Sequence, residues 1–201
     1  TMTFTLTVTD VVTQCKNIDY VKLVDTTGSL MVTIEATPPE ICVGDTSHIE
    51  ISVKGGKRPY LSTWLPAYEQ MYANGNIRVR PSVTTTYTVT VRDQNGAQEI
   101  ASVSVIVNQL PTITIPNYEL CANDTVFIDP TIKTPAGTTI ISYLWTGAGT
   151  PGLHGVTDKE DVPFYLSSQG NYPLILETTN SKGCKNTGNT TVTVLELPIV
   201  N

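Results

Sequence analysis

The sequence predicts an all-β fold built from tandem β-sandwiches, and two observations support this prediction. Residues 86–96 alternate polar and apolar side chains and then reach the turn sequence Asp93-Gln94-Asn95-Gly96, which is typical of a strand and a hairpin turn. The same phrase occurs three times, with the apolar triplets Phe4, Leu6, Val8, then Tyr87, Val89, Val91, then Tyr172, Leu174, Leu176. A phrase written three times indicates a repeat protein.

Length and composition agree with this class. At 201 residues the chain has room for two sandwich modules of roughly 80 to 100 residues and a further piece. Only 15% of the residues are charged, whereas 33 are Thr, a β-branched residue that suits a pleated surface. The net charge of −6 argues against nucleic acid as a partner, because phosphate binding needs clustered Lys and Arg. The longest apolar runs, such as residues 103–107, are too short to span a bilayer.

Residues 1–28 contain two predicted strands, at 3–9 and 16–24, around a turn at 10–14. They match only the last hairpin of a repeat, so we expect them to be the C-terminal hairpin of a preceding repeat. The chain starts at Thr1 without a basic and apolar leader, and we expect that the native N-terminus lies elsewhere.

The first complete repeat is predicted at residues 29–109. Its strands are expected at 32–36, 48–53, 60–65, 77–80, 86–91 and 99–107, with Pro38-Pro39 keeping the first strand at an edge. Gly55-Gly56 with Pro59 predicts the turn before the strand that carries Trp64.

The second complete repeat is predicted at residues 110–196 with the same order. Its strands are expected at 112–115, 125–128, 140–145, 171–177 and 187–195, with a looser middle section at 152–166. Leu110-Pro111 recurs as Leu197-Pro198, so residues 197–201 are predicted to begin a following repeat.

Each repeat has about seven short strands, one Trp on the third strand and a Tyr that opens the penultimate strand. This order predicts a Greek-key β-sandwich of the immunoglobulin or PKD type. We therefore expect Trp64 and Trp145 in the cores rather than at ligand-stacking surfaces. Tyr87 and Tyr172 are expected at tyrosine corners, with hydroxyls bonded to the backbone.

These motifs also carry a family resemblance. The chain resembles the tandem Ig-like/PKD-like repeats of large secreted surface proteins of Bacteroidetes, including gliding-motility adhesins, in the motifs Ile41-Cys42-Val43-Gly44-Asp45, Gly55-Gly56-Lys57-Arg58-Pro59-Tyr60 and Thr84-Thr85-Thr86-Tyr87-Thr88-Val89-Thr90-Val91. In that family a Cys usually follows the Asn-Gly turn, and Ala97 departs from this. The second repeat has Thr134-Pro135-Ala136-Gly137 in place of the Gly-Gly turn.

The resemblance implies export by the type IX route, a cell-surface or extracellular location and a role in adhesion or spacing. It also implies O-glycosylation at Asp-Thr sites, which makes Thr26 and Thr125 candidates.

The four cysteines, Cys15, Cys42, Cys121 and Cys184, are too widely spaced for paired zinc ligands and suit an oxidising compartment. In an immunoglobulin topology Cys42 and Cys121 lie at the bottom of their repeats, whereas Cys15 and Cys184 follow turns at the top. A bond within one repeat would then span a whole domain, beyond disulfide reach. We favour Cys42 with Cys184, which joins two repeats. A Cys121–Cys184 pair, and free thiols or partners outside this sequence, stay open as alternatives.

Tyr68, Met71 and Tyr72 are spaced as on one face of a short helical turn. Capping of the sandwich edge is the favoured interpretation, and a sugar-stacking patch formed by Tyr68 and Tyr72 is the alternative.

No cofactor and no metal are expected. Asp158, Glu160 and Asp161, or Asp93 with Asn95, offer hard oxygens for Ca²⁺ but lack EF-hand spacing, so solvated loop charges are favoured. No nucleophile elbow, phosphate loop or HExxH motif occurs, so no enzyme activity is expected.

Two functions remain from the sequence. The chain is interpreted as a non-catalytic segment of a long cell-surface adhesin, a spacer or stalk whose partners are the neighbouring repeats and surface glycans. The alternative is an accessory module of a secreted polysaccharide hydrolase or peptidase, with carbohydrate binding.

Overall fold

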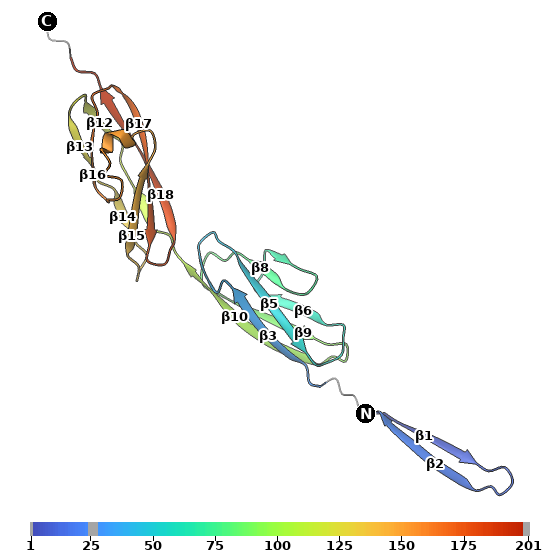
Figure 1. Cartoon of the computed structure of the whole chain (residues 1–201). Coiled ribbons are helices and arrows are strands. Elements are labelled where there is room, and N and C mark those ends of the chain that lie inside the picture. The colour runs from blue at the N-terminus through green and yellow to red at the C-terminus, as the bar shows by residue number, and fades with distance from the viewer. Residues whose placement is uncertain (1, 24–27, 199–201) are drawn as a thin grey trace. The chain divides into compact units, whose positions relative to one another are not determined.

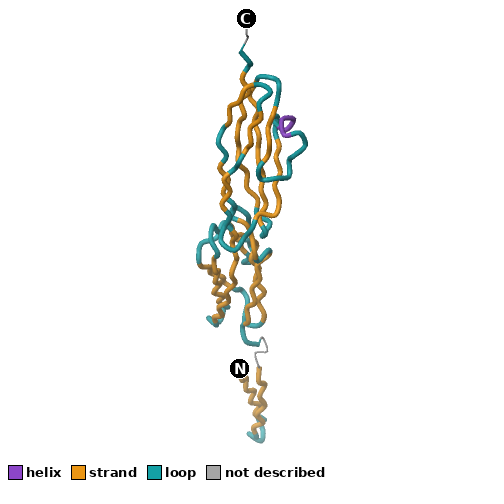
Figure 2. The backbone as a smooth tube through the Cα atoms, turned by 90° about the vertical axis from the view of Figure 1, so that its left-hand side faces the viewer, coloured by secondary structure: helices purple, strands orange, loops and turns teal. Residues whose placement is uncertain are grey.

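The fold is all-β, as predicted. The structure is a computed structural model that describes residues 2–23 and 28–198. Strands account for nearly all of its regular elements, and in this described part the single helix is the 3₁₀ turn η1, Thr150–Leu153 (Figures 1 and 2).

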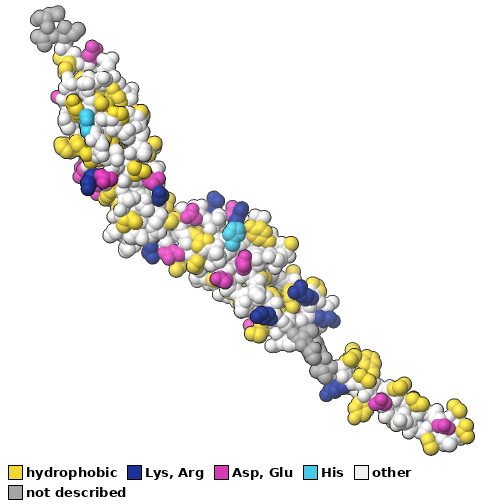
Figure 3. Space-filling model, in the orientation of Figure 1, with side chains coloured by type: hydrophobic (Ala, Val, Ile, Leu, Met, Phe, Trp, Pro, Cys, Tyr) yellow, Lys and Arg dark blue, Asp and Glu magenta, His cyan; other side chains and the backbone are white. Residues whose placement is uncertain are grey.

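The N-terminal hairpin consists of β1 (Met2–Thr9) and β2 (Lys16–Leu23), paired antiparallel. Opposite residues share a face, so most of the apolar side chains lie on one face with Asn17 and Asp19, while the other face carries Thr and Lys together with Ile18 and Tyr20. The apolar side chains of the first face are Met2, Phe4, Leu6, Val8, Val21 and Leu23. All six side chains are exposed, and hydrophobic atoms are prominent on this hairpin in Figure 3. Its assignment to a preceding repeat stays a prediction.

The first repeat forms two sheets. Their strands are β3 (Met31–Thr37), β4 (Glu40–Cys42), β5 (Ser47–Lys54), β6 (Leu61–Leu65), β7 (Gln70–Met71), β8 (Ile77–Val79), β9 (Thr85–Arg92) and β10 (Gln98–Asn108). One sheet has the order β3-β5-β8-β7 and the other has the order β4-β10-β9-β6, with β4 parallel to β10. This is the strand order of an immunoglobulin-like sandwich, with β4 added beside the last strand.

Alternation along the strands builds the core of this repeat. Val89 and Val91 on β9, Val105 on β10 and Val79 on β8 are fully buried, while the Thr and Ser residues between them face outward.

The second repeat repeats this order with one interruption. Its strands are β11 (Thr112–Thr114), β12 (Tyr118–Cys121), β13 (Thr125–Ile128), β14 (Thr131–Lys133), β15 (Ile140–Thr146), β16 (Val162–Tyr165), β17 (Gly170–Asn180) and β18 (Lys185–Leu195). The main sheet is β12-β18-β17-β15, with β12 parallel to β18. Pro130 separates β13, which pairs with β16, from β14, which pairs with β11. A proline lacks the backbone N–H that a continuous ladder needs.

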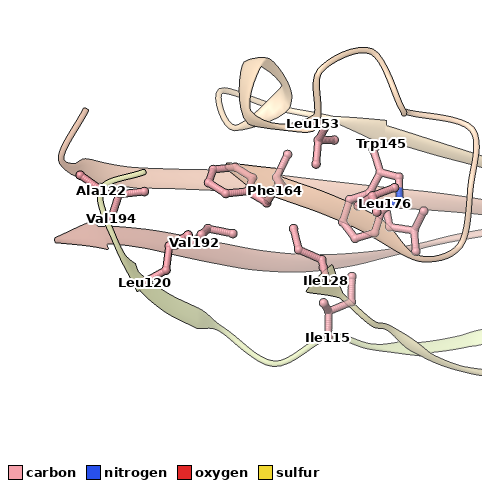
Figure 4. Close-up of a cluster of buried hydrophobic side chains, with 12 residues drawn as sticks. Ile115, Leu120, Ala122, Ile128, Trp145, Leu153, Phe164, Leu176, Val192 and Val194 are labelled. Atoms are coloured by element: carbon pink, nitrogen blue, oxygen red, sulfur yellow. The ribbon is translucent and has the colours of Figure 1, made fainter. Parts of the chain in front are cut away.

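The core of the second repeat surrounds Trp145 and Phe164, and Figure 4 shows the cluster. Aliphatic residues of β17 and β18 close it, including Leu176 and Val192. Gly152 allows η1 to approach, because a Cβ at this position would overlap the Phe164 ring.

The chain divides into two compact units that do not coincide with the sequence repeats. The first contains the described residues up to Thr37, His48–Val79 and Thr86–Ser104. The second contains Pro38–Ser47, Arg80–Thr85 and the described residues from Val105 on. Strand β4 and the end of β10 therefore belong to the same unit as the second sandwich. The repeat boundaries at 29, 110 and 197 stay predictions.

The sequence predictions differ from the structure at short elements. The short strands β4, β12, β14 and β16 were not expected, because a strand of three or four residues shows no periodicity. The helical turn expected at residues 68–72 is wrong, since Gln70–Met71 forms β7 and pairs with β8. Pairing with a neighbouring strand decided the backbone there.

Candidate functional site

The chain contains one disulfide within its described residues, between Cys42 and Cys184. The two Cα atoms lie 5.6 Å apart, within the ordinary range for a disulfide, and 142 positions separate them in sequence. Both cysteines belong to the second compact unit, and Cys184 is fully buried. The bond covalently joins the first sequence repeat to the second. We call Glu40, Cys42, Asn108, Asn180, Lys182 and Cys184 the linkage site.

The parallel pairing of β4 with β10 positions Cys42. Cys42 lies opposite Asn108, and the next residue, Val43, donates its N–H to the Asn108 carbonyl at 2.9 Å. The chain then turns, with the Asp45 N–H donating to the Cys42 carbonyl at 3.0 Å. Gly44 lies at φ +96°, a left-handed conformation that glycine adopts without strain. Cys42 is thus held at the end of a strand rather than on a loose loop.

The side chain of Asn180 positions Cys184. Its Oδ1 accepts hydrogen bonds from the backbone N–H groups of Lys182 and Cys184, each at 3.0 Å. The Asn180 N–H donates to the Cys184 carbonyl at 3.0 Å and closes the hairpin. An Asn that bonds its own backbone two residues on forms an Asx turn. The turn between β17 and β18 is therefore internally braced at the cysteine.

Polar contacts surround the bond. The Asn180 Nδ2 donates to the Gln109 carbonyl at 3.3 Å, and Lys182 Nζ lies 3.0 Å from Glu40 Oε1. Asn108 Nδ2 donates to the same Glu40 oxygen at 2.9 Å. The Asn108 hydrogen bond and then the Lys182 ammonium lower the pKa of Glu40 below its ordinary value.

The pocket at the linkage site is small and polar. It has a volume of about 370 Å³ and is lined by residues of β4, its following turn, Asn108 and Lys182. Across residues 2–23 and 28–198, no group of three or more His, Cys, Asp or Glu side chains is placed to hold a metal ion. The linkage site therefore offers a covalent bond, Cys42–Cys184, and an ion pair, Glu40–Lys182.

The other two cysteines are free thiols: Cys15 is exposed and Cys121 is half-buried. A Cys121–Cys184 bond, one of the alternatives from the sequence, is wrong, because Cys184 is already bonded to Cys42.

The two tryptophans are buried in equivalent places. Trp64 donates its Nε1–H to the Gly75 carbonyl at 3.0 Å, and Trp145 donates to the Lys159 carbonyl at 2.9 Å. Each indole fills its core and ties the segment after its strand to the sandwich.

The two tyrosines differ. The Tyr172 hydroxyl donates to the Ser168 carbonyl at 2.8 Å, four residues upstream, as in a tyrosine corner. Tyr87 is buried, and its hydroxyl has no hydrogen-bond partner in the described part of the chain. Burial raises the pKa of Tyr87. The corner contact is found in the second repeat and not in the first.

Tyr68 and Tyr72 do not lie together on a helical face. Tyr68 is 40% exposed, whereas Tyr72 is half-buried with its ring centroid 6.3 Å from that of His48. A larger pocket, of about 780 Å³, lies near β7 and is lined by Tyr60, Leu61 and Met71, but by neither Tyr68 nor Tyr72. The sugar-stacking role of these two tyrosines stays a prediction.

Two of the acidic candidates, Asp93 and Glu160, are engaged in other contacts. Asp93 accepts hydrogen bonds from the backbone N–H groups of Lys57, Asn95 and Ala97 at 2.8 to 2.9 Å, and the Lys57 bond is the largest cause of its lowered pKa. Glu160 accepts the Tyr143 hydroxyl at 3.0 Å. Both carboxylates serve the fold.

The glycosylation candidates separate. Thr125 is exposed at the start of β13, whereas Thr26 lies outside the described residues.

No family model matches the sequence, and no curated protein matches it. Among solved structures, the chain is similar to an I-band fragment of titin, with 14% identity and a TM-score of 0.44 over 84% of this chain and 66% of the fragment. It is also similar to the N-terminal eight Ig domains of the Down Syndrome Cell Adhesion Molecule, with 11% identity and a TM-score of 0.45 over 83% and 25%. Fibronectin(III)-like modules of Clostridium thermocellum CbhA give 12% identity and a TM-score of 0.35 over 83% and 95%. All three TM-scores are below 0.5, and the immunoglobulin-like description of the repeats rests on their own strand order.

In the described residues, the structure has no helix with the length and apolar character that crossing a membrane requires.

Proposed function

We propose that the chain is a non-catalytic segment of a long cell-surface adhesin in which tandem Ig-like repeats serve as a spacer or stalk. The observation that supports this most strongly is the Cys42–Cys184 bond, which joins one sequence repeat to the next. Such a bond limits how far tension can extend the chain. The function of the bond is therefore mechanical.

The load path follows from the position of the bond. Tension applied at the chain ends passes through Cys42 and Cys184, so the residues between them are shielded even when a sandwich opens. A fully extended chain spans about 3.5 Å per residue, so the bond withholds about 500 Å of extension. The Asn180 turn and the β4–β10 pairing brace the two attachment points against this force.

The proposed location is extracellular. Structural disulfides persist in oxidising compartments, and the fully buried Cys184 is sheltered from solvent. The resemblance to Bacteroidetes surface repeats adds type IX export, an involvement in gliding motility and neighbouring repeats as partners. Exposed Thr125, preceded by Asp124, is the proposed O-glycosylation site.

A second candidate function is an accessory module of a secreted hydrolase or peptidase that binds carbohydrate. Two separate observations favour it: the ring of Tyr68 is exposed, and in the larger pocket Arg58 lies 5.4 Å from the centroid of the Tyr60 ring. Glycan binding that survives the Tyr68→Ala and Tyr72→Ala changes together would remove these two residues from that role.

The test of the proposed function is the intact mass and peptide composition of the native parent protein released from the cell surface. A very large protein whose other peptides come from further Ig-like repeats supports the adhesin. A protein of modest mass that contains a catalytic domain contradicts it and assigns these repeats to an enzyme.

A further inference from the structure

We propose that Cys121 forms a second disulfide of the same kind, with a cysteine that follows the hairpin turn of the next Ig-like repeat. The surface around Glu119 and Cys121 is then a docking site for that repeat. This inference rests on the proposed function, because it requires a following repeat in the parent protein.

The backbone at Cys121 has the same pairing as the backbone at Cys42. Cys42 ends a strand parallel to β10 and lies opposite Asn108, and Cys121 ends a strand parallel to β18 and lies opposite Leu195. The residue after Cys42 donates its N–H to the Asn108 carbonyl, and the residue after Cys121 donates to the Leu195 carbonyl, both at 2.9 Å. The two cysteines therefore occupy the same position on their sandwiches.

The turns after the two cysteines also agree. Asp45 N–H donates to the Cys42 carbonyl at 3.0 Å, and Asp124 N–H donates to the Cys121 carbonyl at 3.1 Å. Asn123, which lies between Cys121 and Asp124, adopts φ +70°, which is uncommon for a residue other than glycine. This conformation matches that of the left-handed Gly44 between Cys42 and Asp45. The second repeat therefore keeps the same turn even though it lacks the glycine.

The acidic partner is present as well. Glu119 precedes Cys121 by two positions, as Glu40 precedes Cys42, and both are exposed. Glu40 binds Lys182, which belongs to the turn that delivers Cys184. Glu119 makes no salt bridge among residues 2–23 and 28–198. The surface thus offers a thiol and a carboxylate in the arrangement that already holds a turn at the linkage site.

The surface next to Cys121 is hollowed. A pocket of about 400 Å³ is lined by Ala122, Asn123, Glu196 and Leu197, together with Ser167 and Gln169. The pocket at the linkage site, which Lys182 helps to line, has a similar volume of about 370 Å³.

The complementary half also recurs in this chain. The hairpin turn of β1 and β2 is anchored by Asp10, whose Oδ1 accepts the Val12 and Thr13 N–H groups at 2.8 Å, and the turn closes with a bond from Asp10 N–H to the Cys15 carbonyl. Cys15 thus closes its turn as Cys184 does, one residue further from the residue that begins the turn. A turn that ends in Cys is a recurring element of these repeats, and Cys15 is exposed in its free form.

The chemistry is thiol–disulfide exchange. The Cys121 thiol and the partner thiol together lose two electrons and two protons to form the S–S bond, and a protein disulfide of the exporting compartment accepts them and is reduced to a dithiol.

The test is a peptide map of the native parent protein, alkylated at acid pH and digested without reduction. We expect the Cys121 peptide to be linked to a peptide of a later repeat, with the cysteine placed four or five residues after an Asn or Asp. A Cys121→Ser variant should lose this linkage and keep Cys42–Cys184, while a Cys15→Ser variant should keep both.

Three results would overturn the inference: an alkylated Cys121, a bond between Cys121 residues of two molecules, or a bond to Cys15 of a second molecule. Failure of the inference and failure of the proposed function give different maps. An alkylated Cys121 in a protein made of many repeats rejects the second disulfide and leaves the spacer intact, whereas a parent with a catalytic domain and no later repeat rejects both.

Discussion

The hairpin turns at Asp93 and Asn180 are folded by the same hydrogen bonds, yet only one of them carries a cysteine. Asp93 accepts the N–H groups two and four residues on at 2.9 and 2.8 Å, and Asn180 accepts the equivalent pair at 3.0 Å. Ala97 ends the first turn and Cys184 ends the second. We call the Asp or Asn that accepts these hydrogen bonds the anchor of the turn. The difference shows that the anchor folds the turn, whereas the cysteine adds a connection to another repeat.

Removing the Cys42–Cys184 disulfide should have the largest effect on the free energy of unfolding. The change Cys42→Ala with Cys184→Ala makes the second turn resemble the first. In the chain-entropy treatment, a loop of about 140 residues gives a stabilisation of up to about 5 kcal/mol. We expect the free energy of unfolding of the second repeat to fall by up to this amount in chemical denaturation of a Trp64→Phe background, where Trp145 fluorescence follows the second repeat.

The matched control for that experiment replaces the free cysteines, Cys15→Ser with Cys121→Ser, and should leave the unfolding midpoint unchanged in the isolated chain. Equal midpoints for the Cys42→Ala/Cys184→Ala variant and the parent would contradict a stabilising role for the bond.

Removing the anchor should have the next largest effect. Asn180→Ala leaves the exposed N–H of Lys182 and the buried N–H of Cys184 without their acceptor, at a cost of about 2 kcal/mol. Asn180→Asp keeps the acceptor oxygen, as Asp93 does, and should cost less. Denaturation midpoints of the two variants measure the difference, and a loss below about 0.5 kcal/mol for Asn180→Ala would show that the cysteine itself holds the turn.

The two anchors should respond differently to acid. The pKa of Asp93 lies below its ordinary value of 3.8, because backbone N–H groups bind its charged form. Its stabilisation is therefore present above about pH 4 and is lost as the pH falls through the lowered pKa. Asn180 does not titrate.

The acid effect can be measured in a Trp145→Phe background, where Trp64 fluorescence follows the first repeat. Asp93→Asn should reduce the loss of stability on acidification, and an identical acid profile for both proteins would refute this assignment.

The smallest effect is expected from the exposed ion pair. Lys182 and Glu40 are 47% and 41% exposed, so solvent screens their attraction. Lys182→Ala should leave the disulfide in place and raise the Glu40 pKa, as should Asn108→Ala, because both side chains favour the charged form of Glu40. Carboxyl NMR titration measures both shifts, and an unchanged Glu40 pKa in either variant would contradict the contact that the variant removes.

The sequence predicted the parts of the fold that depend on periodicity. Alternation at Val89 and Val91, and the matching places of Trp64 and Trp145, are set by which side chains face a core. Strand β12 escaped prediction because its four residues gain their conformation from pairing with β18, far along the chain. Pro130 could be read from the sequence, but its consequence could not. Strands β13 and β14 on either side of it pair with different strands, β16 and β11, and this depends on the opposing sheet.

The linkage site was partly predictable. The immunoglobulin topology favoured Cys42 with Cys184, because it separates the two ends of each sandwich. The sequence analysis did not identify the shared role of Asp10, Asp93 and Asn180 as anchors, although each residue begins its turn. An Asp or Asn at the first position of three repeated turns is the signal that identifies them.

The most direct test of the central claim is single-molecule extension of the chain held at its two ends, with and without reductant. If Cys42 and Cys184 are bonded, the fully extended oxidised chain should be shorter than the reduced chain by about 500 Å. A difference of about 220 Å would indicate a Cys121–Cys184 bond, and no difference would show that the repeats are not covalently linked; either result would contradict the account.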